Sequence, residues 1–186
     1  MKRIFDLIMA ICLLCFLSLP LFIIALMVKL SSKGPVLYRS DRVGKDNKIF
    51  KMSKFRTMRI DTPPVATHLF KDADQYLTPI GSFLRKFSLD ELPQLFNIIS
   101  GDMTFVGPRP ALFNQDDLIQ LRTKKNVHKL IPGVTGWAQI NGRDELPIPT
   151  KVDFDAYYLK HKSLFLDTKI MLITLGKVIK KEGVEH

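Results

Sequence analysis

The sequence predicts a mainly α-helical fold with one small β-hairpin, in which an N-terminal membrane helix over residues 1–33 precedes a globular domain over residues 34–186. An uncharged apolar run from Leu7 to Val28 indicates the membrane helix, and turn residues between the extended runs 36–43 and 48–58 indicate the hairpin. Apolar residues interspersed with lysines over 152–181 indicate amphipathic helices at a membrane interface, although the same pattern suits a solvated face over a core.

The apolar run is long enough to cross a bilayer, because its 22 residues at about 1.5 Å each cover roughly 30 Å of hydrocarbon. Pro20 lies near its middle, where proline removes the hydrogen bond to the carbonyl of Phe16 and bends or breaks a helix. Ser18 can donate its hydroxyl to a backbone carbonyl left without a partner. These residues favour a re-entrant hairpin bent at Ser18 to Pro20, with a straight span as the alternative.

Basic residues flank the apolar run at both ends: Lys2, Arg3, Lys29 and Lys33. A spanning helix usually shows a bias in basic residues between its two sides, so this symmetry indicates that both ends face the same side. The globular domain is then expected on the cytoplasmic face. A cleaved signal peptide is disfavoured, because the apolar run exceeds the usual length and no small-x-small cleavage site follows.

The 28 Lys and Arg residues outnumber the 18 Asp and Glu residues, for a formal net charge of +10. Such a chain favours anionic lipid, phosphorylated substrates or nucleic acid as partners. No zinc-finger spacing, aromatic-glycine RNA signature or recognition-helix pattern is present, so no nucleic-acid partner is predicted. The two cysteines, Cys12 and Cys15, lie in the apolar run and form neither a disulfide framework nor a four-ligand zinc site.

The elements of the globular domain follow from turn and helix-end signals. After the hairpin, residues 61–76 predict a loop beside a ligand, and 80–87 predict a short helix with Thr78 as its cap and Pro79 in its first turn. A helix over 93–99 is expected to stop at Gly101. Residues 107–110 must be extended or form a turn, 111–129 predict a helix, and 132–143 are rich in turns.

Asp90 and Glu91 are adjacent carboxylates directly before the 93–99 helix. One interpretation is a capping box, with Ser88 as N-cap and Glu91 three residues on, but it places Pro93 where proline is unfavourable. A helix with Pro93 in its first turn instead leaves both carboxylates at a helix N-terminus, where phosphate also binds. There the two acids could hold Mg²⁺, and Asp90 could attack phosphorus.

Three arginines lie in turns or at element ends beside prolines and glycines: Arg85, Arg109 and Arg143. The planar guanidinium matches phosphate oxygens with two parallel hydrogen bonds, which lysine cannot do. The group is therefore predicted to bind phosphate, with surface ion pairs as the alternative. His128 and His161 are predicted to be surface or packing residues.

Five ordered blocks of sequence, at residues 54–58, 88–97, 101–103, 107–110 and 132–143, are similar to those of a known family. With them the chain resembles the bacterial sugar transferases called monotopic phosphoglycosyl transferases, from the apolar segment almost to the C-terminus. One departure is that Leu19 separates Ser18 from Pro20, whereas the family often has an adjacent Ser-Pro pair at the break of its N-terminal helix.

The resemblance implies a Mg²⁺-dependent, ping-pong transfer of a phospho-sugar from a UDP-sugar to polyprenyl phosphate, usually undecaprenyl phosphate, with release of UMP. It places the enzyme at the bacterial inner membrane, at the first membrane step of glycoconjugate assembly, with downstream glycosyltransferases as partners. Asp90 would be the nucleophile and Glu91 its partner, both at the metal. The substrate-binding residues that it implies are Arg56, Arg85, Arg109, Arg143 and Asp155.

Two alternatives to this activity remain at the level of sequence. A membrane-anchored basic adaptor would bind anionic lipid or nucleic acid without catalysis, and its binding would fade smoothly with salt. A membrane-bound nucleotidyl transferase or phosphatase would release different products. No pattern in the sequence specifies the sugar or the oligomeric state.

Overall fold

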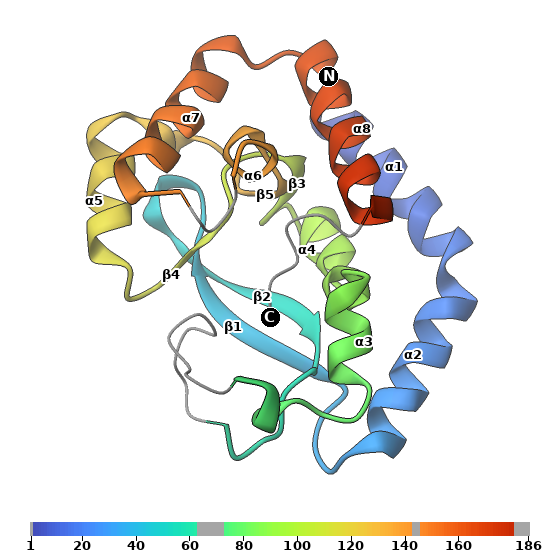
Figure 1. Ribbon diagram of the computed structural model, residues 1–186. Helices are drawn as coiled ribbons and strands as arrows, with labels where there is room; N and C mark the ends of the chain where they lie inside the picture. Colours follow the sequence, from blue (N-terminus) through green and yellow to red (C-terminus); the bar gives the residue numbers. More distant parts are fainter. Residues whose placement is uncertain (1, 63–72, 143–145, 181–186) are drawn as a thin grey trace.

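The computed structural model describes residues 2–62, 73–142 and 146–180. Figure 1 shows a mainly helical molecule in which the helices surround two small sheets. The helices are α1 (Lys2–Phe16), α2 (Ser18–Ser31), α3 (Gly81–Lys86), α4 (Gln94–Ser100), α5 (Asp116–Lys124), α6 (Trp137–Ile140), α7 (Ile148–His161) and α8 (Leu164–Lys180). The strands are β1 (Leu37–Val43), β2 (Ile49–Phe55), β3 (Thr104–Val106), β4 (Ala111–Leu112) and β5 (Gly133–Thr135). The predicted mainly helical class with a small hairpin is confirmed.

The N-terminal apolar segment is two helices that meet at Leu17 with a bend of 66°. Ser18 Oγ donates to the carbonyl of Cys15 over 2.9 Å, which is the kind of contact that the sequence predicts for this hydroxyl. Pro20 lies in the first turn of α2, where a missing N–H leaves no helical hydrogen bond unmade. The bend is therefore confirmed, although the break lies one residue before the predicted Ser18 to Pro20.

Among the described residues, a single helix long and apolar enough to cross a membrane does not occur, but α1 and α2 together meet the length and composition of a span. Each of them buries one face against the globular domain. In α1, Ala10 packs with Met52, Leu95, Ile98 and Met103; in α2, Ile24 and Val28 pack with Phe55, Ile80 and Leu84. The opposite faces expose apolar side chains: Ile4, Ile8, Phe16, Leu19, Phe22, Leu26 and Leu30.

Polar contacts hold the first two turns of α1 to the rest of the molecule. Lys2 Nζ pairs with Asp167 Oδ2 of α8 at 2.6 Å, and Arg3 donates to the carbonyl oxygens of Ile98 and Ile99 at the end of α4. Asp6 is buried and accepts a hydrogen bond from Thr104 of β3 over 2.5 Å. The two basic residues that precede the apolar run, Lys2 and Arg3, are thus engaged in protein contacts.

The predicted hairpin is confirmed by the antiparallel pairing of β1 and β2, whose register runs from Leu37 opposite Phe55 to Val43 opposite Ile49. Its turn carries Asp46 and Asn47 at positive φ, which Asp and Asn tolerate better than most residues. On the other edge of β1, β4 adds a short antiparallel strand, with Val43 opposite Ala111.

The prediction of a continuous helix over 111–129 is wrong at both ends. Ala111 and Leu112 pair with β1, and the Leu112 N–H donates to the Gln115 side chain over 2.8 Å, so helix α5 begins only at Asp116. At the other end Asn126 has a φ of +61°, which stops the helix before a 3-10 turn over Val127–Lys129. At the first of these ends, non-local strand pairing has overridden the local helical pattern.

Thr78 is not the cap of α3. Its hydroxyl donates instead to the carbonyl of Thr57 over 3.3 Å, and no side chain caps the start of the helix. The prediction for α4 is confirmed, because the helix ends at Ser100 and Gly101 follows with a φ of +96°. Residues 132–143, predicted as turns, also contain β5, which pairs in parallel with β3, and α6.

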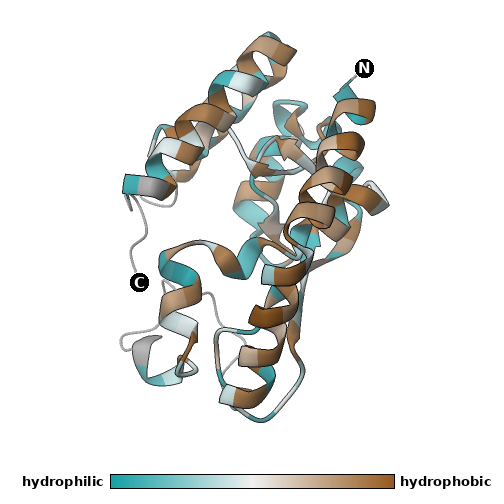
Figure 2. Cartoon of the chain, turned by 90° about the vertical axis from the view of Figure 1, so that its right-hand side faces the viewer, coloured by the Kyte–Doolittle hydropathy of each residue, from teal (hydrophilic) through white to brown (hydrophobic). Residues whose placement is uncertain are grey.

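The predicted amphipathic segment over 152–181 forms two helices with different surroundings. Helix α7 buries Val152, Asp155 and Tyr158 in the domain. Helix α8 buries Ile170 and exposes Phe165, which is 81% accessible, and Leu172, which is 65% accessible. Helices α1, α2 and α8 lie along one side of the molecule, and their apolar residues are seen from that side in Figure 2.

Candidate active site

The two adjacent carboxylates lie on a 3-10 turn, η4 (Leu89–Glu91), between α3 and α4. Ser88 has a φ of +53° and its hydroxyl makes no capping bond, so the capping-box interpretation is wrong. Pro93 stands immediately before α4, as expected for a helix with proline at its start. Asp90 is buried, with only 7% of its surface exposed.

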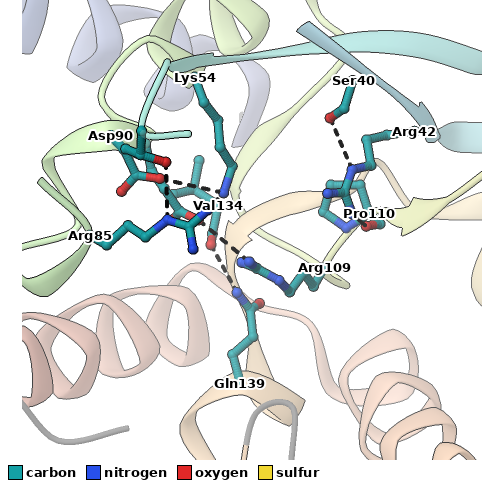
Figure 3. Close-up of polar contacts among 11 residues, drawn as sticks. Ser40, Arg42, Lys54, Arg85, Asp90, Arg109, Pro110, Val134 and Gln139 are labelled. Carbon is teal, nitrogen blue, oxygen red and sulfur yellow. Dashed lines mark hydrogen bonds and ion pairs between the residues drawn. The ribbon is translucent and has the colours of Figure 1, made fainter. Parts of the chain in front are cut away.

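Three cationic side chains from different elements converge on this turn (Figure 3). Lys54, near the end of β2, places its Nζ 2.7 Å from Glu91 Oε1 and 3.9 Å from Asp90 Oδ2. Arg109 Nη2 lies 3.5 Å from the same Glu91 oxygen. Arg85 of α3 donates from Nε to Thr57 Oγ1 over 3.0 Å, with its guanidinium close enough to Asp90 to stabilise the ionised carboxylate.

Burial raises the pKa of Asp90 above its ordinary value, because the charged form loses hydration. The positive charge of Lys54 opposes this rise and the negative charge of Glu91 adds to it, while Arg85 and Arg109 favour the ionised form less strongly. The result is a carboxylate that is poorly solvated and held among cations. Such a group is suited to nucleophilic attack on a phosphorus atom whose oxygens the cations bind.

Lys54 was not among the residues that sequence analysis selected for the site. It belongs to the first of the five blocks, at residues 54–58, and that block offered the available signal. Its place near the end of β2 could be read from the hairpin pattern, but its distance from Glu91 depends on how β2 packs against η4, a contact between segments 37 residues apart.

Arg56 does not join the cationic cluster. It is 4% exposed, and its guanidinium donates to the carbonyl oxygens at the C-terminal end of α2 and just beyond, at Val28, Ser32 and Lys33. These carbonyls have no helical partner, and the helix dipole makes this end attractive to a cation. Arg56 therefore fastens the second N-terminal helix to the strand segment that carries Lys54.

The direct contacts of Asp155 also lie outside the cationic cluster. Its Oδ2 accepts hydrogen bonds from Nε and Nη2 of Arg122, at 3.0 Å and 2.7 Å, and the residue is 1% exposed. Burial raises the pKa of Asp155, and the Arg122 guanidinium opposes the rise. Arg143, the remaining predicted arginine, falls outside the described residues.

The segment that presents Arg109 is packed backbone against backbone. The Gly107 N–H donates to the carbonyl of Thr135 and the Gly133 N–H donates to the carbonyl of Pro108, both over 2.9 Å. A Cβ at Gly133 would stand 2.1 Å from the nitrogen of Gly107, so only glycine allows this approach. Glycine at this position thus lets the backbone of β5 pack directly against the backbone of the residues that precede Arg109.

A divalent cation would find two protein ligands here. Within the described residues, no three His, Cys, Asp or Glu side chains group closely enough to hold a metal by themselves. Magnesium usually takes one or two protein carboxylates and completes its shell with water and substrate phosphates. Asp90 and Glu91 fit that pattern, because they are adjacent and lie where the cations would bind phosphate.

Comparison with known proteins shows matches over nearly the whole chain. The model of the family described as "Bacterial sugar transferase" matches residues 1–181. The sugar transferase EpsL of Bacillus subtilis is 42% identical, over 100% of this chain and 91% of that protein. The UDP-glucose:undecaprenyl-phosphate glucose-1-phosphate transferase of Escherichia coli is also 42% identical, over 95% of this chain.

A more distant relative differs in the sugar that it is named for. The UDP-N-acetylgalactosamine-undecaprenyl-phosphate N-acetylgalactosaminephosphotransferase of Aeromonas hydrophila is 34% identical over 96% of this chain. The chain spans 40% of the Escherichia coli protein and 43% of the Aeromonas protein, so its similarity to both is confined to less than half of their length.

Proposed function

The chain belongs to the bacterial sugar transferase family and is a phosphoglycosyl transferase, and on this basis we propose that it transfers a phospho-sugar from a UDP-sugar to undecaprenyl phosphate and releases UMP. The observation that carries the proposal is the buried Asp90 carboxylate beside Glu91, surrounded by Lys54, Arg85 and Arg109. The cations can bind the phosphate oxygens of both the diphosphate donor and the lipid phosphate, and the carboxylate between them can attack phosphorus.

The reaction proceeds in two displacements at Asp90. In the first, a carboxylate oxygen of Asp90 attacks the sugar-bearing phosphorus of the donor, and the bond from that phosphorus to the bridging oxygen breaks, so UMP leaves. In the second, a phosphate oxygen of undecaprenyl phosphate attacks the same phosphorus, and the bond to Asp90 breaks. The products are the lipid diphosphosugar and the regenerated carboxylate, so one site serves a soluble and a membrane-held substrate in turn.

The cations neutralise the phosphate oxygens on which negative charge accumulates during each displacement. Arg109 and Arg85 can offer two parallel donors to a phosphate, whereas Lys54 offers a single charge close to both carboxylates. Glu91 holds Lys54 and Arg109 in place through one shared oxygen. Asp90 and Glu91 would hold Mg²⁺, which supplies further charge neutralisation to the donor diphosphate when bound.

The location follows from the lipid acceptor and the apolar side of the molecule. The exposed apolar faces of α1, α2 and α8 are proposed to enter the inner membrane as a re-entrant hairpin and an interfacial helix, with the globular domain on the cytoplasmic face. Arg56 and the contacts of Lys2, Arg3 and Asp6 then hold the active site at a set height above the lipid. The product would pass to downstream glycosyltransferases that extend the lipid-linked sugar.

The activity is tested with purified protein in detergent, given Mg²⁺, undecaprenyl phosphate and a panel of UDP-sugars that includes UDP-glucose, UDP-galactose and UDP-N-acetylgalactosamine. We expect UMP release with at least one donor, loss of release on chelation of Mg²⁺, and loss of release in Asp90→Asn. An absence of UMP with every donor, or full activity in Asp90→Asn, would refute the proposal.

The topology is tested separately in intact cells. After Cys12 and Cys15 are replaced by serine, one cysteine is placed in a short tag ahead of Lys2 and another replaces Lys48 in the exposed hairpin turn. A re-entrant hairpin predicts that neither reacts with an impermeant thiol reagent until the cells are opened. Reaction of the tag cysteine from outside would show that the segment spans the membrane.

A further inference from the structure

We propose that Arg122 and Asp155 form a positioning relay that fixes the backbone of Arg109, and through it the guanidinium that faces Glu91. In this assignment Asp155 acts through Arg122 and does not touch substrate. The inference rests on the proposed function, because its consequence is measured as the rate of the first displacement.

The relay begins with a buried ion pair between two helices. Asp155 of α7 is 1% exposed and Arg122 of α5 is 8% exposed. A single oxygen of Asp155 accepts from both Nε and Nη2 of Arg122, at 3.0 Å and 2.7 Å. Because the guanidinium is planar and rigid, two hydrogen bonds along one edge set the direction of its remaining nitrogen, Nη1.

That remaining nitrogen donates to the backbone of Arg109. Arg122 Nη1 lies 2.8 Å from the carbonyl oxygen of Arg109, and this carbonyl belongs to the peptide bond that leads into Pro110. Holding the carbonyl therefore sets the ψ angle of Arg109. The prolines on either side restrict the rest of the segment, because each fixes its own φ and limits the residue before it.

The neighbouring carbonyls of the same segment are each held by a different element. The Gly133 N–H of β5 holds the carbonyl of Pro108 over 2.9 Å, and Arg42 of β1 holds the carbonyl of Pro110 over 3.3 Å (Figure 3). Arg122 supplies the bond between them, at the residue whose side chain reaches Glu91. Three successive carbonyls are thus anchored around one catalytic guanidinium.

A stabilising role alone does not explain a buried ion pair well. Removing two charges from water is unfavourable, and apolar side chains of similar size often stabilise a core as well or better. The guanidinium gives something that an apolar pair cannot, namely a donor aimed at a chosen carbonyl. We therefore assign the pair to placement of Arg109 rather than to the stability of the α5 and α7 contact.

The test compares Arg122→Lys and Asp155→Asn with wild type in UMP release from donor alone. Lysine keeps the positive charge but cannot donate to Asp155 and to the Arg109 carbonyl with the fixed geometry of the guanidinium. We therefore expect the rate constant of the first turnover to fall by about 10- to 100-fold. The amount of UMP released in the first turnover per molecule of total protein should stay at the wild-type level, with folding checked by circular dichroism. A purely structural role would lower that amount and leave the rate constant unchanged, which would overturn the relay.

A matched control lies on the same two helices. Lys125 and Asp153 form an exposed ion pair between the end of α5 and helix α7, and exposed ion pairs contribute little, so Asp153→Asn should keep the wild-type rate constant. A double-mutant cycle adds the decisive comparison. In an Arg109→Ala background the Arg122→Lys change should have less than about a twofold further effect, because its route of action has been removed.

The outcomes separate the two proposals. A wild-type enzyme that releases UMP while Arg122→Lys matches it in rate overturns the relay alone. A loss in Arg122→Lys that multiplies the loss in Arg109→Ala also overturns it, since the two residues would then act independently. A wild-type enzyme that releases no UMP from any UDP-sugar defeats the proposed function, and the relay falls with it.

Discussion

Lys54 Nζ lies 2.7 Å from Glu91 Oε1, so the strand that ends the β-hairpin supplies a cation in direct contact with the turn η4. The same ammonium group is 3.9 Å from Asp90 and favours its ionised form. This relationship connects the charge state of the proposed nucleophile to a residue on a separate element of the fold.

Replacing Lys54 with glutamine should reduce UMP release by about 10- to 100-fold, because a partly buried Glu91 loses an ion-pair partner and the phosphates lose a cation. The pKa of Asp90, already raised by burial, should rise further when the favourable charge of Lys54 is removed. Activity requires the ionised form, so its acid limb should move to higher pH. The pH profile of UMP release from donor alone measures this shift.

Lys51→Gln is the matched control, since Lys51 lies on the same strand in an exposed pair with Asp41. It should leave both the rate and the acid limb near the wild-type values, because exposed ion pairs contribute little. An acid limb that stays in place in Lys54→Gln would show that this ammonium does not control the ionisation of Asp90.

Replacing Arg56 with glutamine should destabilise the protein by about 2–4 kcal/mol, because buried carbonyls at the end of α2 lose their donors. Thermal unfolding in detergent measures the effect. Arg59→Gln serves as the control, since Arg59 pairs with Asp61 at the surface, and its change should stay within about 0.5 kcal/mol. Equal midpoints for the two variants would contradict the role assigned to Arg56.

The hydrogen bond between Asp6 and Thr104 predicts energetic coupling between the first helix and β3. Asp6→Ala and Thr104→Val should each destabilise the protein by about 1–3 kcal/mol. In the double variant the two effects should fall short of additivity by about 1 kcal/mol, because each change removes the same bond. Denaturant unfolding of the four proteins completes the cycle, and strict additivity would show that the contact is not made in solution.

The fold was predictable where the signals are local, and less so where they are not. Gly101 ends α4 through its own backbone conformation, and Ser18 finds its acceptor three residues away, so both follow from neighbouring residues. Asp6 and Thr104 are 98 residues apart, and the pairing of Thr104 with Gly133 depends on a parallel contact that no local pattern encodes. The false helical start at 111 has the same origin.

The candidate site divides in the same way. Asp90 and Glu91 could be selected because adjacent acids before a proline-initiated helix are a local feature. The functions of Arg56 and Asp155 could not be separated from direct substrate contact, because their partners lie on α2 and α5. Lys54 was not predicted as a site residue, because no neighbouring residue in the sequence indicates that its side chain contacts Glu91.

The raised pKa of Asp90 predicts that the nucleophile lowers the stability of the folded protein at neutral pH. The folded state holds the proton more tightly than the unfolded state, so stability is lost as pH rises from the ordinary value of 3.8 through the raised pKa. Asn cannot ionise and escapes this loss. Without added divalent cation, the unfolding midpoint of Asp90→Asn should therefore exceed that of wild type, by a margin that grows as pH rises from 3.8 through the raised pKa of Asp90.

A margin that shrinks with rising pH would contradict this reasoning. Asp102→Asn provides a control for the removal of an acid near α4, because the Asp102 side chain accepts a hydrogen bond from the Ser100 hydroxyl, which asparagine can also accept. The margin measured for Asp90→Asn is compared with that of Asp102→Asn at each pH.

The central claim is that Asp90 becomes bonded to the sugar-bearing phosphate, and mass spectrometry of enzyme quenched after incubation with Mg²⁺ and donor alone tests it most directly. We predict a phospho-sugar adduct on the peptide that contains Asp90, formed together with UMP, removed on addition of undecaprenyl phosphate, and absent from Asp90→Asn. Release of UMP with no adduct, or an adduct on another residue, would contradict the mechanism.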